Sequence, residues 1–374
     1  MGTLTASPVA DAVACVPLVE ALDLGAPVWD GLLECSPAAA PFAGWAWHQA
    51  WAHSAPREDL EASHAVLLRD SDGAVAALLP VGIRRLVFRR RCVTALTWAI
   101  EDVGCPDHLD VPARPDADLE AMIPALLSLP WDVLILNNVA SAAANAPRLA
   151  AALRHCGATV RQIPVWSCPY LDLPPSWDDY LASLSANRRQ RLRREERNLL
   201  RDHTVVRTDY DTERFEEGWR RLVSLHELRW AGAGAFSDAR VERLHRNFAE
   251  AAARRGELWL TTLDVDGQPA AAWYGFAHRD TVYFYQSGRD PRWERQSVGL
   301  VLMTQMIRHA IERGYRRFDF LRGDEAYKGL WTASQRRTVE LVIFRPGWRG
   351  LWLRSLDLVG LLRARILGRR AARV

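Results

Sequence analysis

The stretch that decides the fold runs from Glu257 to Asp290 and reads ELWLTTLDVDGQPAAAWYGFAHRDTVYFYQSGRD. Three apolar runs are separated by Asp266-Gly267 and by Arg279-Asp280, and short polar breaks of this kind are typical of β-hairpins. We therefore expect three antiparallel strands, over 257–265, 270–277 and 281–287.

The flanking residues extend this pattern in both directions. Downstream, the expected elements alternate: a helix over 298–313 ended by Gly314, a strand over 317–321, a short helix over 325–331 and a strand over 338–344. Upstream, apolar residues at helical spacing predict helices over 177–201 and 212–230 and another after Ser237 or Asp238. Such alternation indicates layered α/β or α+β packing, with mixed sheets flanked by helices.

The length of 374 residues suggests two domains. The first half also alternates helices and strands, and Asp72-Gly73 predicts a hairpin between strands over 64–69 and 74–83. The proline-rich segment 164–175 is the predicted crossing between the domains. The expected boundaries are a first domain over 1–165, a second over 166–349 and a basic amphipathic helix over 350–374.

Composition excludes several classes of protein. Apolar residues make up 49% and charged residues 25%, as in ordinary globular proteins and unlike disordered or fibrous chains. No window of about 20 apolar residues predicts a transmembrane helix, and the N-terminus lacks a signal-peptide pattern, so we expect a cytoplasmic chain. The six cysteines form no C-x-x-C pair, and we expect no metal site.

Positive charge is concentrated in two stretches. Residues 180–201 hold seven Arg and two Glu, and residues 336–374 hold ten Arg and two acids. Such stretches favour anionic partners, which are a phosphate-bearing cofactor, nucleic acid or an anionic membrane surface. Of the 48 basic residues only Lys328 is Lys. This indicates a position where the planar guanidinium of Arg cannot replace the compact ammonium of Lys.

Three positions near the C-terminal strands carry candidate chemistry. Gln296-x-x-Gly299 opens the helix after the third strand, and the free N–H groups of a helix N-terminus suit a pyrophosphate. Asp319 faces away from the Phe on either side of it, where it could orient or deprotonate an amine. Lys328 could hold a carboxylate, a phosphate or a developing oxyanion. Residues of these types also serve as helix caps, surface ion pairs and core packing.

Longer motifs resemble a known family. They are Gln286-Ser287-Gly288-Arg289-Asp290-Pro291, then Ser297-Val298-Gly299-Leu300, then the segment from Phe318 to Lys328 with Trp331. These motifs resemble the GNAT-like acetyltransferases of the CelD and BioF-like group, which are distant relatives of the FemABX peptidyltransferases. The resemblance spans roughly residues 40–345 and implies two tandem GNAT-like domains, the first degenerate. Position 301 is Val where the GNAT phosphate-binding pattern has Gly or Ala.

The resemblance implies an N-acyltransferase that moves an acyl group, in our expectation acetyl, from a CoA thioester to an amine acceptor. Polysaccharide or cell-envelope biosynthesis is a candidate setting. The expected catalytic residues are His226, Tyr285, Asp319, Asp324 and Lys328. The residues expected to bind acyl-CoA are Gln286, Arg295, Gln296, Ser297, Val298, Gly299 and Leu300. The residues expected to bind the acceptor are Arg229, Trp230, Arg322, Glu325, Tyr327 and Trp331.

Two other functions remain open. An aminoacyl-tRNA-dependent transferase, which the FemABX kinship allows, would hold RNA with the Arg-rich helix over 187–201. A non-catalytic module would simply dock an anionic partner. The helix over 350–374 is expected either to pack on its domain or to attach the chain peripherally to the anionic inner face of the membrane.

Overall fold

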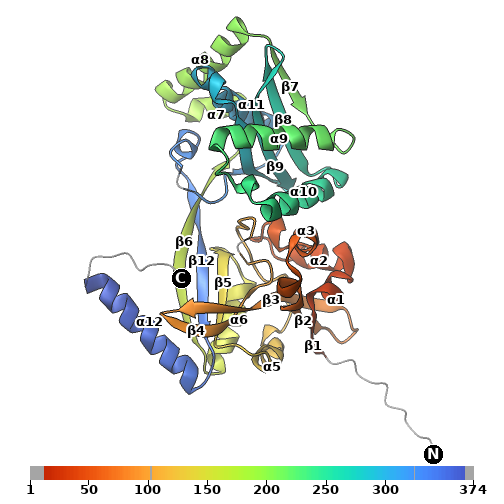
Figure 1. Ribbon diagram of the computed structural model, residues 1–374, viewed down its shortest axis with the longest axis vertical. Coiled ribbons are helices and arrows are strands. Elements are labelled where there is room, and N and C mark those ends of the chain that lie inside the picture. The colour runs from red at the N-terminus through yellow and green to blue at the C-terminus, as the bar shows by residue number, and fades with distance from the viewer. Residues whose placement is uncertain (1–11, 102, 324, 367–374) are drawn as a thin grey trace, which may run out of the picture. The chain divides into compact units, whose positions relative to one another are not determined.

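The structure is a computed structural model that describes residues 12–101, 103–323 and 325–366. The chain divides into two compact units, unit 1 (residues 1–165 and 337–374) and unit 2 (residues 166–336). The chain leaves unit 1 within strand β6 (Thr159–Asp172) and returns to it within strand β12 (Gln335–Phe344), as the colours of Figure 1 trace.

Unit 1 is built on strands in the order β1-β2-β3-β4-β5-β12. The first five are β1 (Val13–Pro17), β2 (Ser63–Arg69), β3 (Val75–Phe88), β4 (Arg91–Trp98) and β5 (Val133–Ala140). The predicted hairpin at Asp72-Gly73 is confirmed, because β2 and β3 pair in antiparallel fashion across it. Gly73 has a φ of +80°, a left-handed conformation that glycine adopts without strain.

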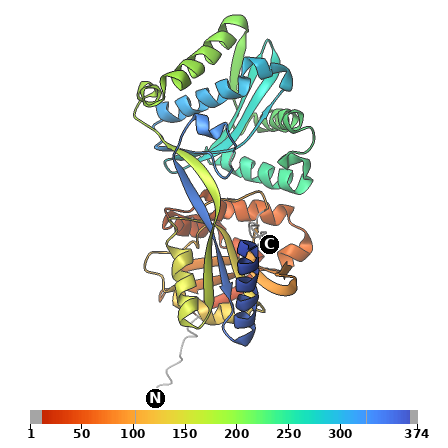
Figure 2. The same ribbon diagram turned by 90° about the vertical axis from the view of Figure 1, so that its left-hand side faces the viewer.

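The helices of unit 1 are short except for the last. They are α1 (Leu18–Leu22), α2 (Gly25–Glu34), α3 (Trp45–Ser54), α4 (Arg57–Glu61), α5 (Ile123–Ser128), α6 (Asn145–His155) and α12 (Trp348–Ile366), with 3₁₀ turns η1 (Pro41–Ala43) and η2 (Leu119–Met122). Figure 2 shows α12 in front of the strands of unit 1. Within the described residues, no helix is both long and apolar enough to cross a bilayer.

Unit 2 has strands in the order β6-β11-β10-β9-β8-β7. These include β7 (Val205–Asp209), β8 (Leu258–Val265), β9 (Gln268–His278), β10 (Thr281–Arg289) and β11 (Arg317–Asp319). The helices are α7 (Trp177–Ser183), α8 (Ala186–Asp202), α9 (Phe215–Trp230), α10 (Ala239–Arg254) and α11 (Val298–Glu312), with 3₁₀ turns η3 (Ala235–Ser237), η4 (Pro291–Gln296) and η5 (Lys328–Leu330). The three predicted antiparallel strands are β8, β9 and β10, and their pairing is confirmed.

The sheet of unit 2 is covered by helices on both faces. Side chains of α8 and α11 share one buried cluster with Trp273 and Phe318, whereas side chains of α9 and α10 share another with Ala272 and Tyr274. Ala272 and Tyr274 flank Trp273 on β9, and successive strand residues point to opposite faces. The alternating side chains of β9 therefore contribute to two separate hydrophobic cores.

The mixed α/β fold in two tandem units agrees with the sequence prediction, but two local predictions were wrong. The proline-rich segment 164–175 does contain the crossing between the units, and most of it continues β6 as a strand. The predicted helix over 177–201 is broken, because Leu184 is extended and Ser185 starts α8 by capping the backbone N–H of Arg188. The helix expected over 325–331 is only the turn η5. Moreover, residues 337–349 belong to unit 1, since β12 pairs with β5 there.

Helix α12 is anchored to unit 1 by one buried carboxylate, and this generates a stability prediction. Asp357 is fully buried and forms ion pairs with Arg89 at 3.0 Å and Arg161 at 2.8 Å. Replacing one partner of a buried pair leaves an uncompensated charge. We expect Asp357→Asn to lower the free energy of unfolding by about 3–5 kcal/mol in urea titrations. The exposed Asp178→Asn is the control, and equal losses in both variants would contradict the assignment.

Candidate active site

Strands β10 and β11 pair only briefly and then separate. They are parallel over three residues, Thr281–Tyr283 against Arg317–Asp319, and β11 ends there while β10 continues to Arg289. A bulge between Phe284 and Gln286 bends β10 just beyond the paired segment. Within the described residues, no strand pairs with this edge of β10 beyond Tyr283. Ligands of α/β sheets bind at such a place, outside the carboxyl ends of parallel strands.

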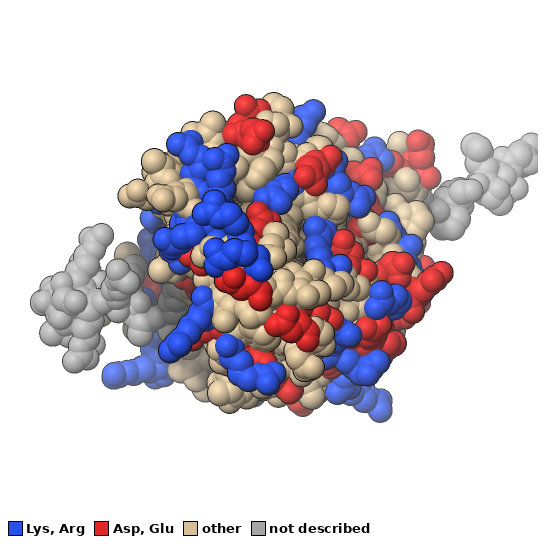
Figure 3. Space-filling model, turned by 90° about the horizontal axis from the view of Figure 1, so that it is seen from above, with Lys and Arg blue, Asp and Glu red and all other residues tan. Residues whose placement is uncertain are grey.

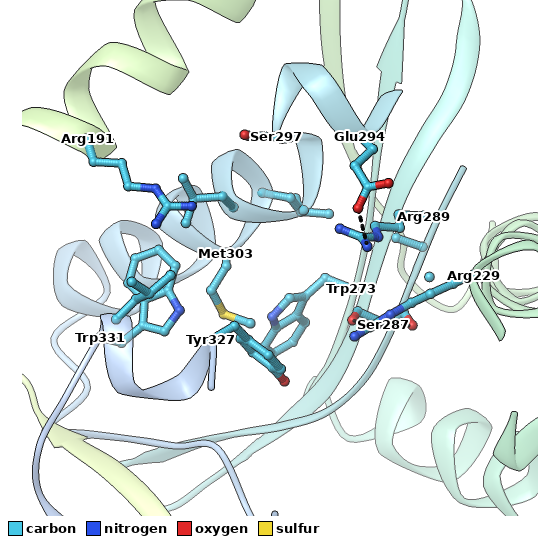
Figure 4. A pocket seen from close by; sticks show the side chains of 16 residues that line it. Arg191, Arg229, Trp273, Ser287, Arg289, Glu294, Ser297, Met303, Tyr327 and Trp331 are labelled. Atoms are coloured by element: carbon cyan, nitrogen blue, oxygen red, sulfur yellow. Dashed lines mark hydrogen bonds and ion pairs between the residues drawn. The ribbon is translucent and has the colours of Figure 1, made fainter. Parts of the chain in front are cut away.

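A cavity of about 380 Å³ lies where the two strands diverge. It is lined by residues of seven segments of unit 2, namely α8, α9, β9, β10, η4, the start of α11 and the turn around η5. In Figure 4 the side chains of Trp273, Met303, Tyr327 and Trp331 converge on its centre. These side chains give the cavity apolar walls beside its polar lining, a combination that is usual for sites that take an organic ligand.

Positively charged side chains enter the cavity from three elements. Arg191 comes from α8, Arg229 from α9 and Arg289 from β10, as Figure 4 shows. Glu294 is the acidic residue of the lining, and it forms an ion pair with Arg289 at 3.2 Å. Arg229 donates to the backbone carbonyl of Ser287 at 3.3 Å. Three guanidinium groups against one carboxylate give the cavity a net positive charge, which favours an anionic ligand.

The N-terminus of α11 opens into the same cavity. Ser297 precedes the helix in a left-handed conformation with a φ of 52°, and no side chain caps the first turn. The backbone N–H groups of residues 298–300 therefore lack an acceptor within the helix. Ser297, Gly299 and Leu300 line the cavity, so these N–H groups and the helix dipole lie at its edge. A Cβ added at Gly299 would meet only the side chain of Arg289, at 3.8 Å.

The structure brings six of the predicted site residues together in this cavity. These are Ser297, Gly299, Leu300, Arg229, Tyr327 and Trp331. Four others lie close by in the sequence but do not line it: Gln286, Arg295, Gln296 and the buried Val298. Trp230 is exposed and stacks under the Arg229 guanidinium at 4.8 Å. Asp324 lies outside the described residues.

Two predicted catalytic residues, Asp319 and Lys328, lie outside the cavity lining and have internal partners. Asp319 is fully buried, accepts the backbone N–H of Leu321 at 2.7 Å and is paired with Arg336. Lys328 Nζ donates to the Arg322 carbonyl at 2.6 Å and contacts Glu325 at 2.9 Å. These contacts hold the turn after β11, and they indicate that both residues position the segment that carries Tyr327.

The remaining predicted residues also lie outside the lining. Tyr285 packs against His245, with ring centroids 4.2 Å apart, in the layer of α9 and α10. Arg322 stacks over the Trp166 ring at 5.5 Å. His226 is fully buried and contacts Phe236, with ring centroids 4.6 Å apart. Burial, with a further contribution from Arg229, lowers the pKa of His226 to about 4, so His226 is neutral near pH 7.

Sequence reasoning missed several residues that line the cavity. Arg289, Ser287 and Gly288 stand in the motif that carried the family resemblance, and Arg191 stands in the Arg-rich helix, so a signal existed for these four. Trp273 and Met303 have none, because a strand Trp and a helix Met are ordinary core residues by pattern. Among the described residues, no group of three or more His, Cys, Asp or Glu is placed to hold a metal ion.

Residues 186–329 match the family model described as an acetyltransferase (GNAT) domain. The match lies within unit 2 and includes every lining segment except the final Leu330 and Trp331. This segment of unit 2 is therefore similar to a GNAT-type acetyltransferase domain. A comparison with curated proteins finds no significant match.

Several solved structures share the fold across both units. FemX has a TM-score of 0.55 at 11% identity, with 85% of this chain and 95% of that chain covered. The C-terminal domain of a protein described as a lysylphosphatidylglycerol synthetase, from Agrobacterium fabrum, has a TM-score of 0.53 at 12% identity, with 92% and 96% covered. L-PGS from Bacillus licheniformis has a TM-score of 0.52 at 14% identity, with 95% and 98% covered. At these identities the comparison shows the fold alone.

The buried His226 generates a prediction on pH dependence. Its pKa of about 4 in the folded chain lies below the unfolded value of about 6.5, so the unfolded chain binds more protons between these limits. Stability should therefore be complete above about pH 6.5 and fall as the pH falls towards 4, by up to about 1.4 kcal/mol per pH unit for this group. Urea unfolding at pH 7, 6 and 5 measures the slope.

The matched variants are His226→Asn and the exposed His53→Asn. We expect the first to reduce the pH slope and the second to leave it unchanged. An NMR titration of the wild-type His226 ring checks the same pKa directly. A midpoint near 6.5 would contradict the burial argument.

Proposed function

We propose that unit 2 is an N-acyltransferase whose acyl donor is a CoA thioester, in the simplest case acetyl-CoA, bound in the cavity between β10, α11 and η5. The observation that carries this proposal is the coincidence of a cationic cavity, an uncapped helix start and an open strand edge within a GNAT-type domain. The acceptor in this proposal is an amine.

The phosphate-bearing end of the donor lies at the start of α11 in this proposal. A diphosphate there accepts hydrogen bonds from the free N–H groups of residues 298–300. The positive end of the helix dipole stabilises its negative charge. Arg191 and Arg289 supply the opposing charges on the cavity wall. Among the described residues, no acidic side chain pairs with Arg191, which leaves this guanidinium available for an anion.

The chain of the donor that carries the thioester then follows β10. Its amide groups can bond the strand edge that β11 leaves open beyond Tyr283, as an added strand does in peptide recognition. Trp273, Met303 and Trp331 enclose the apolar part of this chain. The acyl carbonyl lies beside Tyr327 in this proposal, because Tyr327 lines the cavity.

In the reaction, the amine attacks the thioester carbonyl, the C–N bond forms and the C–S bond breaks, and the proton that the nitrogen loses ends on the released CoA thiol. Negative charge develops first on the carbonyl oxygen and then on the leaving sulfur. Burial, with a further contribution from Glu325, raises the pKa of the Tyr327 phenol above its ordinary value. Tyr327 therefore keeps its proton and serves as a hydrogen-bond donor to the developing charge rather than as a base.

Donor binding is tested with Gly299→Glu. The position has room for a side chain, and a carboxylate in the first turn suits the helix dipole, so the variant should fold normally. The same carboxylate would occupy the proposed phosphate site, and we expect CoA affinity in calorimetry to fall at least tenfold. Gly31→Glu, at an exposed helix position with open space around it, is the control. Absence of CoA binding to the wild-type chain would refute the acyl-CoA proposal.

Catalysis is tested with Tyr327→Phe. Loss of one donor to a developing oxyanion typically costs 10²–10³ in kcat, and we expect about a hundredfold loss with the Kd for CoA nearly unchanged. Tyr315→Phe, on a partly buried ring outside the cavity, should keep full activity. Equal kcat in both variants would remove Tyr327 from the mechanism. Tight CoA binding without any turnover would instead favour the non-catalytic module.

The aminoacyl-tRNA alternative is supported by a specific surface. Helix α8 exposes Arg188, Arg191, Arg193 and Arg197, and Figure 3 shows basic side chains gathered to the left of centre, over α8. Among the described residues, no acid pairs with these four. A transferase of this kind would bind a nucleic-acid backbone there, with affinity that falls steeply between about 50 and 200 mM salt.

The pair Arg191→Glu and Arg193→Glu separates the two donors. Both residues are exposed on α8, but only Arg191 lines the cavity. For a CoA donor, Arg191→Glu should weaken binding at least tenfold and Arg193→Glu should leave it unchanged. For an RNA donor, both variants should weaken binding and both should reduce its salt dependence.

A further inference from the structure

The inner face of α12 is held against unit 1 by packing. Leu353 is fully buried in a cluster with Phe88 of β3 and Phe344 of β12, and Leu356 packs against the same cluster. The ion pairs of Asp357 with Arg89 and Arg161 lie on this side of the helix as well. Rotation of α12 would break a buried charge network, so the opposite face is fixed towards solvent.

That outer face is apolar. It carries five large hydrophobic side chains, whose exposed fractions run from 42% to 80%: Trp348, Leu351, Trp352, Leu358 and Val359. Spacings of three, four, ten and eleven residues place them on one side of a helix. They are five of the eleven exposed large hydrophobic side chains among the described residues, although α12 is a small part of the chain. A gathering of this kind marks a binding surface.

The charges around this face are positive. The acidic residue of α12 is Asp357, which is buried, so the helix presents no exposed carboxylate up to Gly360. Arg90 and Arg91 are exposed at the turn between β3 and β4, and the Arg91 guanidinium lies over the Trp352 ring at 5.7 Å. Among the described residues, neither Arg is paired with an acid. Apolar side chains that include Trp, bordered by unpaired Arg, match the interface of an anionic bilayer.

We propose that the outer face of α12, together with Arg90 and Arg91, binds an anionic lipid bilayer, with the helix lying in the plane of the membrane surface. Trp348 and Trp352 enter the interfacial region, where their rings combine an apolar body with a polar N–H. Each Arg beside an anionic surface strengthens partitioning about fivefold. This surface belongs to unit 1 alone, and the proposal does not depend on the function proposed for unit 2.

The test is flotation of the full chain with vesicles at about 0.1 M salt. Vesicles of equal parts phosphatidylglycerol and phosphatidylcholine are compared with phosphatidylcholine alone. We expect the wild-type chain to partition at least tenfold more strongly onto the anionic vesicles. Leu351→Glu/Leu358→Glu should lose at least tenfold of that binding, because both side chains point to solvent and the change places carboxylates on the docking face.

Two further variants keep the test decisive. Arg90→Glu/Arg91→Glu lies outside the helix and should lose the preference for anionic vesicles even if the helix variant folds poorly. Val206→Glu/Leu228→Glu is the matched control, because these side chains are equally exposed but lie in unit 2, and it should float like the wild-type chain.

Three outcomes would overturn the proposal. The first is a wild-type chain that stays with the soluble fraction. The second is flotation unaffected by both the helix and the turn variants. The third is a wild-type dimer in light scattering that Leu351→Glu/Leu358→Glu converts to monomer while flotation is unchanged, which would show that a second copy of the chain covers this face.

Discussion

The site of unit 2 depends on where β11 stops. Asp319 ends the strand because its carboxylate accepts the backbone N–H of Leu321 and pairs with Arg336, so that the chain turns instead of continuing beside β10. Leu321 takes a left-handed conformation with a φ of 54° at this turn. Because β11 ends after three residues, the edge of β10 beyond Tyr283 stays open and the cavity forms beside it. Asp319 does not line the cavity, but by ending β11 it leaves the space in which the cavity forms.

Buried carboxylates matched with Arg recur through the chain. Asp319 holds the turn after β11 and Asp357 holds α12 on unit 1, and both are fully buried. Such pairs add little net stability compared with apolar packing. Loss of one partner, however, leaves a buried charge uncompensated and destabilises the fold. The pairs therefore favour the one arrangement of their segments in which both partners meet. Lys328 serves the turn after β11 in a related way, with a compact ammonium between backbone carbonyls and Glu325. A planar guanidinium does not fit that group of acceptors.

The two faces of the unit 2 sheet have different chemistry. Trp273 points from β9 into the cavity, whereas Tyr274 points to the opposite core beside His245 and Trp219. On that second face, His226 is neutral and fully enclosed, and a Cβ at Gly234 would lie 2.1 Å from its Cε1. The proposed donor chemistry therefore belongs to the α8 and α11 side.

The sequence alone determined the three antiparallel strands of unit 2 and the segment that carries the site. Polar turns at Asp266-Gly267 and Arg279-Asp280 separate the three strands, and the segment from Gln286 to Trp331 contains most of the cavity lining. These signals are local, since strand alternation, turn residues and a helix start depend on neighbours in the chain.

Only the tertiary structure decided which of the charged residues meet in the cavity. Asp319 and Lys328 stand in the same motif as Tyr327, yet their side chains have buried partners, while Arg191 and Trp273, from α8 and β9, line the cavity. Likewise, the tertiary structure showed that Asp357 is buried and that the apolar side of α12 faces outward. Burial and pairing arise from segments far apart in the chain, such as Arg89 and Asp357, and no periodicity within one segment encodes them.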